Sequence, residues 1–188
     1  MCETSDVRWS RLFADLDAQV EAAERADRAA ETAELRRLEL SRVVFRDRLA
    51  GAVGNAVTLS VSGADALKGS LTQVGSDWLL LDSPGAGETL VAIAAVMSVT
   101  GLPAASAPAA DGVDRELGLA SVLRRLARDR AAVTVVARSG ATLTGTIDRV
   151  GLDFVDLAEH EPDQPRRTVD VRRVRTVALA SLALVRPV

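Results

Sequence analysis

Cysteine, lysine and aromatic residues are all scarce in this chain. Cys2 is the single cysteine, so neither a disulfide within the chain nor a cysteine-based metal site can form. Lys68 is the single lysine among 23 basic residues, so arginine carries nearly all of the positive charge. Aromatic residues make up 3% of the sequence and hydrophobic residues 48%, with no tyrosine. We therefore expect an aliphatic core of Val, Leu and Ala.

Long apolar runs and a strong net charge are lacking as well. The acidic start of the chain, Met1–Asp6, does not resemble a signal peptide. The longest apolar stretches, such as Leu90–Met97, are too short to span a bilayer. The net charge of −3 implies no general attraction to nucleic acids or anionic membranes. These features predict a cytoplasmic protein that makes no membrane contact.

The N-terminal region has the apolar spacing of a helix, from about Ser5 to Val53. In its middle, Ala22–Ala33, the apolar face consists of alanine alone. We therefore expect either one long helix or two helices with a weak joint in this alanine region. One stripe comprises Trp9, Leu12, Phe13, Leu16 and Val20. A second comprises Leu35, Leu38, Phe45 and Leu49, which we expect to pack on the domain that follows. Gly51 and Gly54 are expected to end the helical region.

From Ala56 onward the apolar period changes to two, which is typical of half-buried strands. Turn residues separate the short strands expected at 57–61, 67–74, 78–82, 89–94 and 97–101. The expected fold is α+β and mainly β. It consists of a helical arm at 1–54, a first small barrel at 55–102, a linker at 103–113, and a helix with a second barrel at 114–188.

An internal repeat is the strongest signal in the sequence. Gly69–Leu81 aligns with Gly145–Leu157 at an offset of 76, sharing Gly, Val-Gly, Asp, an aromatic residue and Leu at the same spacing. Val91–Val96 aligns with Val177–Leu182 at an offset of 86. The second copy therefore carries about ten extra residues between its third and fourth strands. Each copy is expected to form a five-stranded barrel preceded by a helix, with its mid-strand glycine allowing close backbone approach.

The shared pattern G-x-[LI]-x-x-V-G-x-D-[WF]-[LV]-x-L resembles the Sm-like small-barrel superfamily, with the PRC-type barrel as second choice. The layout is also similar to that of uncharacterised actinobacterial proteins. In RNA-binding Sm-like proteins, a polar residue before the third strand and an Arg-Gly pair between the fourth and fifth strands contact bases. Asp77 and Asp153 fall near the first position, but Ala94-Ala95 and Ala180-Ser181 replace both Arg-Gly pairs. The resemblance thus implies the fold and weakens the usual RNA site.

Arginines are the main candidates for a binding surface, because a guanidinium suits phosphate and carboxylate groups. Residues 111–188 carry 13 arginines and 11 acids, whereas residues 51–110 carry one base and four acids. The candidate surface for an anion or an acidic partner comprises Arg166, Arg167, Arg172, Arg173 and Arg175 on the inserted hairpin, with Arg124 and Arg128 on the second helix. The alternative is a solvated surface with local ion pairs.

The remaining polar motifs favour structural roles over catalysis. Asp77 and Asp153 lie in tight turns, where an aspartate accepts hydrogen bonds from backbone N–H groups. His160, the single histidine, is expected to lie exposed in a loop. The glycines at 83–87 lack the Lys-Ser/Thr of a phosphate loop. We expect no catalytic residues, no metal site and no cofactor.

The Trp9–Val20 stripe has no evident partner within the chain, so we expect it to bind another helix, through self-association or a protein partner. The expected function is a non-enzymatic binding or scaffolding protein. The alternative is an RNA-binding regulator that uses the arginine-rich hairpin.

Overall fold

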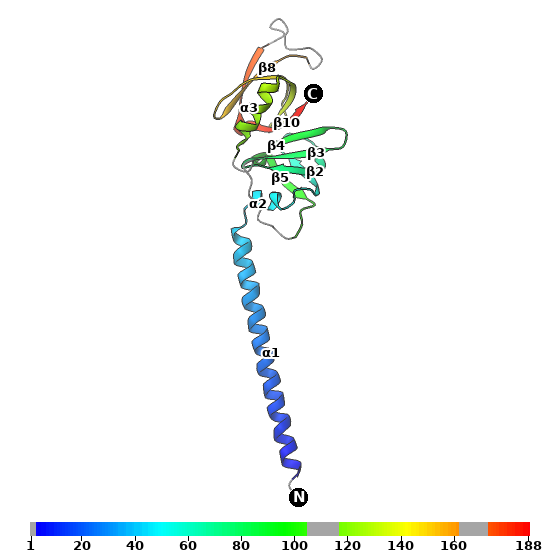
Figure 1. The fold of residues 1–188 in the computed structure, drawn as a ribbon, viewed down its shortest axis with the longest axis vertical. Helices are drawn as coiled ribbons and strands as arrows, with labels where there is room; N and C mark the ends of the chain where they lie inside the picture. The colour runs from blue at the N-terminus through cyan, green and yellow to red at the C-terminus, as the bar shows by residue number, and fades with distance from the viewer. Residues whose placement is uncertain (1–2, 105–116, 162–172) are drawn as a thin grey trace. The chain divides into compact units, whose positions relative to one another are not determined.

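The structure, a computed structural model, describes residues 3–104, 117–161 and 173–188, with side chains from Phe13 onward. It divides into two compact units, residues 1–43 and 44–188. Helix α1 (Glu3–Arg42) forms the first unit, drawn in blue in Figure 1, and the second unit holds all the described strands. No helix among the described residues combines the length and the apolar character needed to cross a membrane.

Helix α1 runs without a break through the alanine-rich region. The alternative of two helices with a joint at Ala22–Ala33 is therefore wrong. Alanine is the strongest helix former, and residues 3–42 contain neither glycine nor proline. The break comes at Val43 and Val44, where two adjacent β-branched residues disfavour the helix. A short helix, α2 (Phe45–Ala50), follows as part of the second unit, with Leu49 fully buried in the core. Leu35 and Leu38, on α1, have exposed side chains within the first unit, and their packing on the domain that follows stays a prediction.

The described part of the second unit contains ten strands and, besides α2, helix α3 (Leu119–Asp129). The strands of the first repeat are β1 (Ala56–Val61), β2 (Leu67–Val74), β3 (Trp78–Ser83), β4 (Gly87–Ala92) and β5 (Val96–Thr100). Those of the second repeat are β6 (Ala132–Ala137), β7 (Thr142–Val150), β8 (Phe154–Glu159), β9 (Arg173–Ala178) and β10 (Leu182–Pro187). Short 3₁₀ turns, η1 (Ile93–Ala95) and η3 (Leu179–Ser181), separate the last two strands of each repeat.

The two repeats share their strand pairing residue by residue. Leu79 of β3 pairs with Val91 of β4, and Val155 of β8 pairs with Val177 of β9, as the offsets of 76 and 86 require. A shift of register lies between Leu71 and Gln73 in one copy, and an equivalent shift follows Ile147 in the other. Three residues separate β3 from β4 and thirteen separate β8 from β9, so the predicted position of the insertion is confirmed.

The mid-strand glycines also behave as the sequence predicts. A Cβ built on Gly69 would clash with the Asp82 carbonyl, and one on Gly145 would clash with the Ala158 carbonyl. In both repeats, therefore, the backbone of the second strand approaches the third strand too closely for any side chain.

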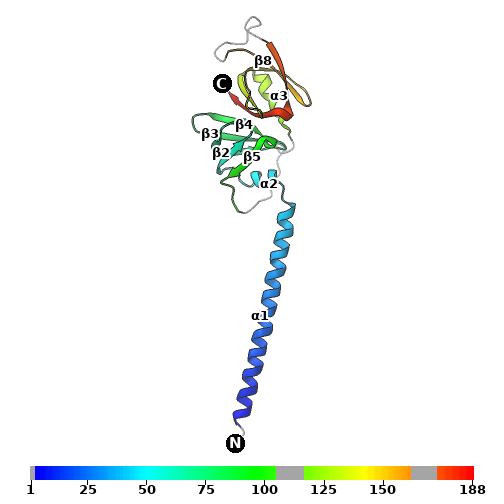
Figure 2. The ribbon, with the colours of Figure 1, turned by 180° about the vertical axis from the view of Figure 1, so that it is seen from behind.

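The strands form a single antiparallel sheet, whereas the sequence predicted two separate barrels. The order is β5-β1-β2-β3-β4-β10-β6-β7-β8-β9, because β10 pairs with β4 as well as with β6. Leu184 faces Val91 and Val185 faces Leu90 in this ladder. Among the described strands, β4 does not pair with β5 and β9 does not pair with β10, so no ladder closes either repeat. Figure 2 shows the strands of the first repeat from behind.

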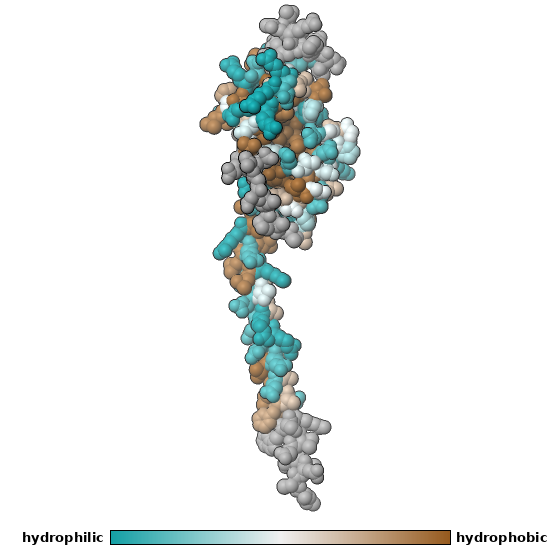
Figure 3. All heavy atoms as spheres, viewed as in Figure 1, coloured by the Kyte–Doolittle hydropathy of each residue, from teal (hydrophilic) through white to brown (hydrophobic). Residues whose placement is uncertain are grey.

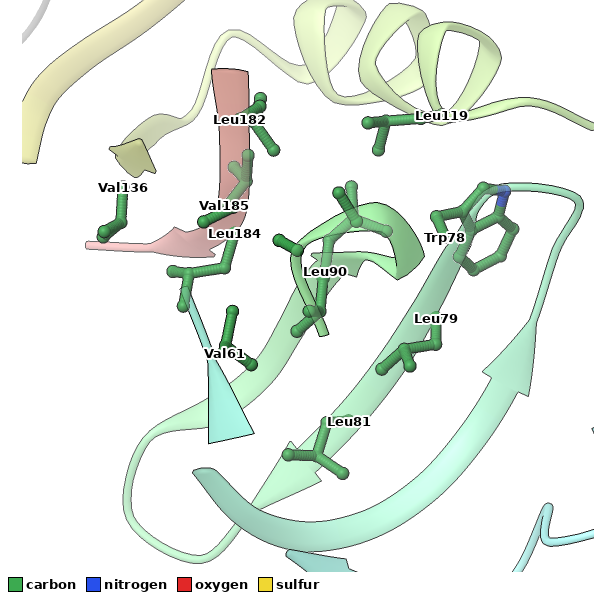
Figure 4. Close-up of a cluster of buried hydrophobic side chains, with 14 of the residues drawn as sticks. Val61, Trp78, Leu79, Leu81, Leu90, Leu119, Val136, Leu182, Leu184 and Val185 are labelled. Carbon is green, nitrogen blue, oxygen red and sulfur yellow. The ribbon is translucent and has the colours of Figure 1, made fainter. Parts of the chain in front are cut away.

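One aliphatic core extends through both repeats. Figure 4 shows Leu79 and Leu81 of β3, Leu90 of β4, and residues of α3 and β10 converging on it. All of these side chains are buried, and apart from Trp78 the core is built from Leu, Val, Ile and Ala, as the composition predicts. The repeats are therefore joined both by a backbone ladder and by shared apolar packing.

A second contact between the repeats involves their first hairpin turns. Gly63, in the turn between β1 and β2, lies so close to the β6–β7 turn that a Cβ would clash with the Ala137 carbonyl. Its backbone also has a φ of +78°, which favours glycine. The two repeats consequently meet at this pair of turns as well as at the β4–β10 ladder.

Candidate functional site

The turn between β2 and β3 holds the start of helix α3. Trp78 Nε1 donates a hydrogen bond of 2.8 Å to the Leu117 carbonyl, and Ser76 Oγ donates one of 3.2 Å to the same oxygen. The backbone N–H of Leu119 donates to Asp77 Oδ1 at 2.7 Å. Asp77 thereby satisfies one of the amides that a helix leaves unpaired at its N-terminus. The prediction that this aspartate accepts from a backbone N–H is confirmed, and its partner lies far along the chain.

A groove of about 450 Å³ lies between α3 and the outer face of β3 and β4. Apolar side chains from both repeats and from α3 line most of it: Trp78, Leu80, Leu90, Leu117, Val122, Leu126, Val133 and Val185. Its charged lining consists of Glu88, Arg125, Asp129 and Arg186. This groove marks where α3 covers the first repeat, and its mixed charges favour no particular sign of ligand.

The corresponding face of the second repeat carries exposed apolar residues. Leu152, in the turn between β7 and β8, is 88% exposed, and Phe154 at the start of β8 is 37% exposed. Val174 of β9 is also exposed. Helix α3 reaches this turn through Arg124, whose guanidinium donates to the Gly151 carbonyl at 2.8 Å. The aromatic position that is buried beneath α3 in the first repeat is thus partly open in the second.

The predicted self-association stripe lies on a single helix, α1. The structure describes side chains for Phe13, Leu16 and Val20, and all three are exposed. Trp9 and Leu12 belong to the same helix, but their side chains lie outside the described ones. Figure 3 shows apolar residues in brown between the hydrophilic residues along α1.

The predicted arginine surface is described only in part, since Arg166, Arg167 and Arg172 lie outside the described residues. Arg173 and Arg175 begin β9, and both bind the carboxylate of Glu159, Arg173 through Nε at 2.7 Å. Arg124 binds the Gly151 carbonyl, and Arg128 is exposed on α3. The structure thus brings Arg173 and Arg175 together around one acid and places Arg124 on a separate element.

The titration of Glu159 reflects this arrangement. Burial alone raises the pKa of Glu159, but hydrogen bonds and charges from Arg173 and Arg175 outweigh it, so the pKa lies below its ordinary value of 4.5. The carboxylate therefore stays ionised at neutral pH and offsets much of the charge of the two arginines.

The expected exposure of His160 is wrong, because its side chain is buried. Its Nε2 lies 2.8 Å from Thr146 Oγ1, and its Nδ1 lies 2.8 Å from the Glu161 carbonyl. When Nδ1 carries the proton and donates to that carbonyl, Nε2 accepts from the hydroxyl of Thr146. Both ring nitrogens are then satisfied inside the protein, which gives His160 a structural role.

Sequence reasoning missed the residues that bind α3, because Trp78 was recognised only as a repeated aromatic position. The alternative of local ion pairs among the hairpin arginines is met where Glu159 binds Arg173 and Arg175. The offset of 76 pairs Trp78 with Phe154, so the repeat itself could have signalled that both turns serve as docking positions. Among the described residues, no cluster of histidine, cysteine and acidic side chains could hold a metal ion.

No family model matches this chain, and no curated protein sequence matches it either.

Proposed function

We propose that this chain is a non-enzymatic scaffolding protein that pairs with a second copy through helix α1. The paired helices join the two copies, and each copy contributes its ten-stranded unit as a binding body. Within that unit, each repeat is a small barrel of the Sm-like kind, a proposal supported by the shared motif, the identical strand order and the equivalent register shifts.

The observation that carries the proposal is the exposure of α1 along its length. Every described side chain between residues 13 and 42 is exposed, except Ala33, which is partly covered. Helices in proteins gain most of their stability by packing an apolar face, and that face usually meets another element. An apolar face on α1 therefore calls for a partner helix.

The apolar residues of α1 share one face. At about 100° per residue, Leu16, Val20, Leu35 and Leu38 fall within an arc of roughly 100°, together with Phe13. Leu40 lies on the opposite side and is equally a leucine on the same helix. The stripe is therefore apolar towards its two ends, with Glu24 and Glu31 on the same face between them, and Leu40 offers a control position.

Charge favours an antiparallel arrangement of the two helices. Residues 13–24 carry four acids and no base, whereas residues 35–42 carry three arginines and one acid. In an antiparallel pair, the acidic segment of one copy faces the basic segment of the other, and Leu16 approaches Leu35 and Leu38 of the second copy. A parallel pair would place like charges against each other.

The test measures the molar mass of the full chain by light scattering. Leu16→Glu should abolish the dimer, because it buries a charge in the stripe, whereas Leu40→Glu should leave the dimer intact. Leucine and glutamate have similar helix propensities, so neither variant should melt α1 by itself. A monomeric parent, or equal effects of the two substitutions, would contradict the proposal.

The direction of pairing has its own test. Arg36→Glu with Arg37→Glu should weaken the dimer, and adding Asp15→Arg with Asp17→Arg should restore it if the helices are antiparallel. If the four-residue variant stays as weak as the double variant, the antiparallel arrangement is wrong.

The described arginines lend less support to the RNA-binding alternative. Arg173 and Arg175 share the Glu159 carboxylate, which lowers the positive charge available to phosphates.

A further inference from the structure

A pocket of about 490 Å³ lies on the outer face of the first repeat, and we call it the β2 pocket. Thr58 faces both Lys68 and Thr100 across the strands there, and Ser70 faces Asp82. The polar side chains of β1, β2, β3 and β5 that line the pocket, together with Pro84 of the β3–β4 turn, are Thr58, Lys68, Ser70, Asp82 and Thr100. All of these except Thr58 are exposed, so the pocket is open to a ligand.

A buried hydroxyl lies against the wall of this pocket without a partner. Ser83, between the lining residues Asp82 and Pro84, is 9% exposed, and its Oγ makes no hydrogen bond within the described part of the chain. A Cβ built on Gly69, which also lines the pocket, would lie 2.9 Å from that oxygen. Since buried polar groups in proteins usually have a partner, the pocket wall holds hydrogen-bonding capacity that the described residues leave unused.

The second repeat shows a side chain in the corresponding place. Three lining residues of the β2 pocket are exposed, and their counterparts at the offset of 76 are all buried. These pairs are Ser70 with Thr146, Asp82 with Ala158, and Pro84 with His160. A face that is open in the first repeat is thus covered in the second, and a histidine is among the residues at the covered place.

The imidazole of His160 is held by the counterpart of a pocket residue. Its Nε2 lies 2.8 Å from Oγ1 of Thr146, which corresponds to Ser70, and its backbone N–H donates to the Thr144 carbonyl at 3.3 Å. In the first repeat, Pro84 has neither an imidazole nor a backbone N–H. The first repeat therefore keeps the hydroxyl that holds the ring in the second repeat, but its own chain does not supply the ring from this position.

We propose that the β2 pocket binds the imidazole ring of a ligand, in the place that His160 takes in the second repeat. The hydroxyl of Ser70 donates to one ring nitrogen, as the hydroxyl of Thr146 does. The other ring nitrogen carries a proton, and Asp82, which stands where the second repeat has Ala158, supplies an acceptor in the same pocket.

The pocket is larger than one ring, so the ligand extends beyond the imidazole. Lys68 stands where the second repeat has Thr144, and its ammonium group suits an acidic group next to the ring. His160 itself lies between Glu159 and Glu161 in the sequence. The ring can come from a histidine within an acidic peptide or from a small molecule, and the experiment below distinguishes the two sources.

Lys68 allows a direct measurement, because it is the single lysine of the chain and lines the pocket. Labelling the full chain with ¹⁵N-lysine gives one backbone amide signal in a nuclear magnetic resonance spectrum. Titration with 4-methylimidazole near pH 8.5, where the ring is mostly neutral, should shift this signal in a saturable way. Half-saturation is expected at about 1–10 mM, as befits a ligand of so few atoms.

Three variants test the site that the repeat identifies. Pro84→His should place the chain's own ring in the pocket and weaken binding of 4-methylimidazole at least about tenfold. Ser70→Ala should weaken it about fivefold, because one hydrogen bond is lost. Ser98→Ala is the matched control, since it removes an exposed hydroxyl of β5 that does not line the pocket, and binding should not change. Circular dichroism checks folding, and Ser70→Ala decides the test if Pro84→His does not fold.

Two capped peptides identify the source of the ring. One copies residues 158–161 of this chain, Ala-Glu-His-Glu, and the other has alanine in place of histidine. Binding of the histidine peptide at lower concentration than 4-methylimidazole, with no binding of the alanine peptide, supports the proposal with a peptide as the source. Binding of the free ring alone supports it with a small molecule as the source.

The proposal is overturned if the Lys68 signal shows no saturable shift up to about 100 mM 4-methylimidazole. Equal effects of Ser70→Ala and Ser98→Ala overturn it as well, and so does equal binding of the two peptides. The signal reports on the pocket and not on the molar mass, so the result does not depend on whether α1 pairs.

Discussion

The two repeats have the same strand order and the same registers, but their surroundings differ. In the first repeat, the turn before β3 is covered by α3, and β4 is covered by β10. In the second repeat, the turn before β8 exposes Leu152 and Phe154, and β9 lies at the end of the sheet. The second repeat therefore supplies the helix that covers the turn before β3 and the strand that pairs with β4.

A matched pair of positions shows a second difference. Ser83 ends β3, and its buried hydroxyl has no hydrogen-bond partner among the described residues. Glu159 ends β8 at the corresponding position and binds Arg173 and Arg175. Three residues join β3 to β4 in the first repeat, whereas in the second repeat an ion-pair network stands where β8 ends and β9 begins. The two repeats thus differ in chemistry at this position while sharing the register of these strands.

The largest expected effect concerns the glycines that the repeats share. Gly69→Ala and Gly145→Ala should each lower the free energy of unfolding by about 3 kcal/mol, because the added Cβ meets the backbone of the next strand. Gly118→Ala is the control, since its nearest atoms lie 3.8 Å away in ordinary contact. Chemical denaturation of the three variants gives the values. A difference above about 1 kcal/mol between Gly69→Ala and Gly145→Ala would break the equivalence of the repeats at this position.

A smaller effect is expected where the repeats touch through their turns. Gly63→Ala should cost about 1–2 kcal/mol more than Gly85→Ala in the free energy of unfolding. Both residues have positive φ angles, +78° and +81°, but a Cβ on Gly63 clashes with Ala137, whereas nothing lies within 4 Å of one on Gly85. Thermal and chemical denaturation measure the difference. Equal costs would mean that the turns are not in tight contact.

The sequence predicted much of the second unit because local signals and the repeat agreed. Alternating apolar residues predicted β2 at 67–74, and the offsets of 76 and 86 placed the insertion between β8 and β9 correctly. Both signals depend on neighbours along the chain or on a copy of the same pattern. They predict strands, turns and register with little need for information about distant contacts.

Contacts between the repeats could not be predicted in that way. Pairing of β4 with β10 depends on which edge strand of the first repeat meets which edge strand of the second. The spacing of apolar residues along the chain does not encode that choice. His160 was misjudged because its partner Thr146 lies on β7, 14 residues away along the chain, so the contact that covers it exists only after folding. An apolar stripe such as that of Leu35 and Leu38 likewise shows that a helix face needs a partner but not which partner.

The smallest expected effect concerns the pH dependence at the base of the insertion, which the first repeat should lack. The pKa of Glu159 is lowered in the folded chain, so its ionised form contributes stability above the pKa of the unfolded state. That contribution is lost as the pH falls below 4.5 and through the lower folded pKa. Glu159→Gln should therefore destabilise the protein at pH 7 by less than about 1 kcal/mol, since Arg173 is largely exposed and screened. Denaturation curves at pH 7 and near pH 3 should show that the difference in the free energy of unfolding between parent and variant shrinks in acid.

Ser83→Ala is the control from the first repeat, where no ionisable group occupies the position, and its effect should not change with pH. A difference for Glu159→Gln that stays constant, or grows, as the pH falls would show that the carboxylate is not held ionised by the two arginines.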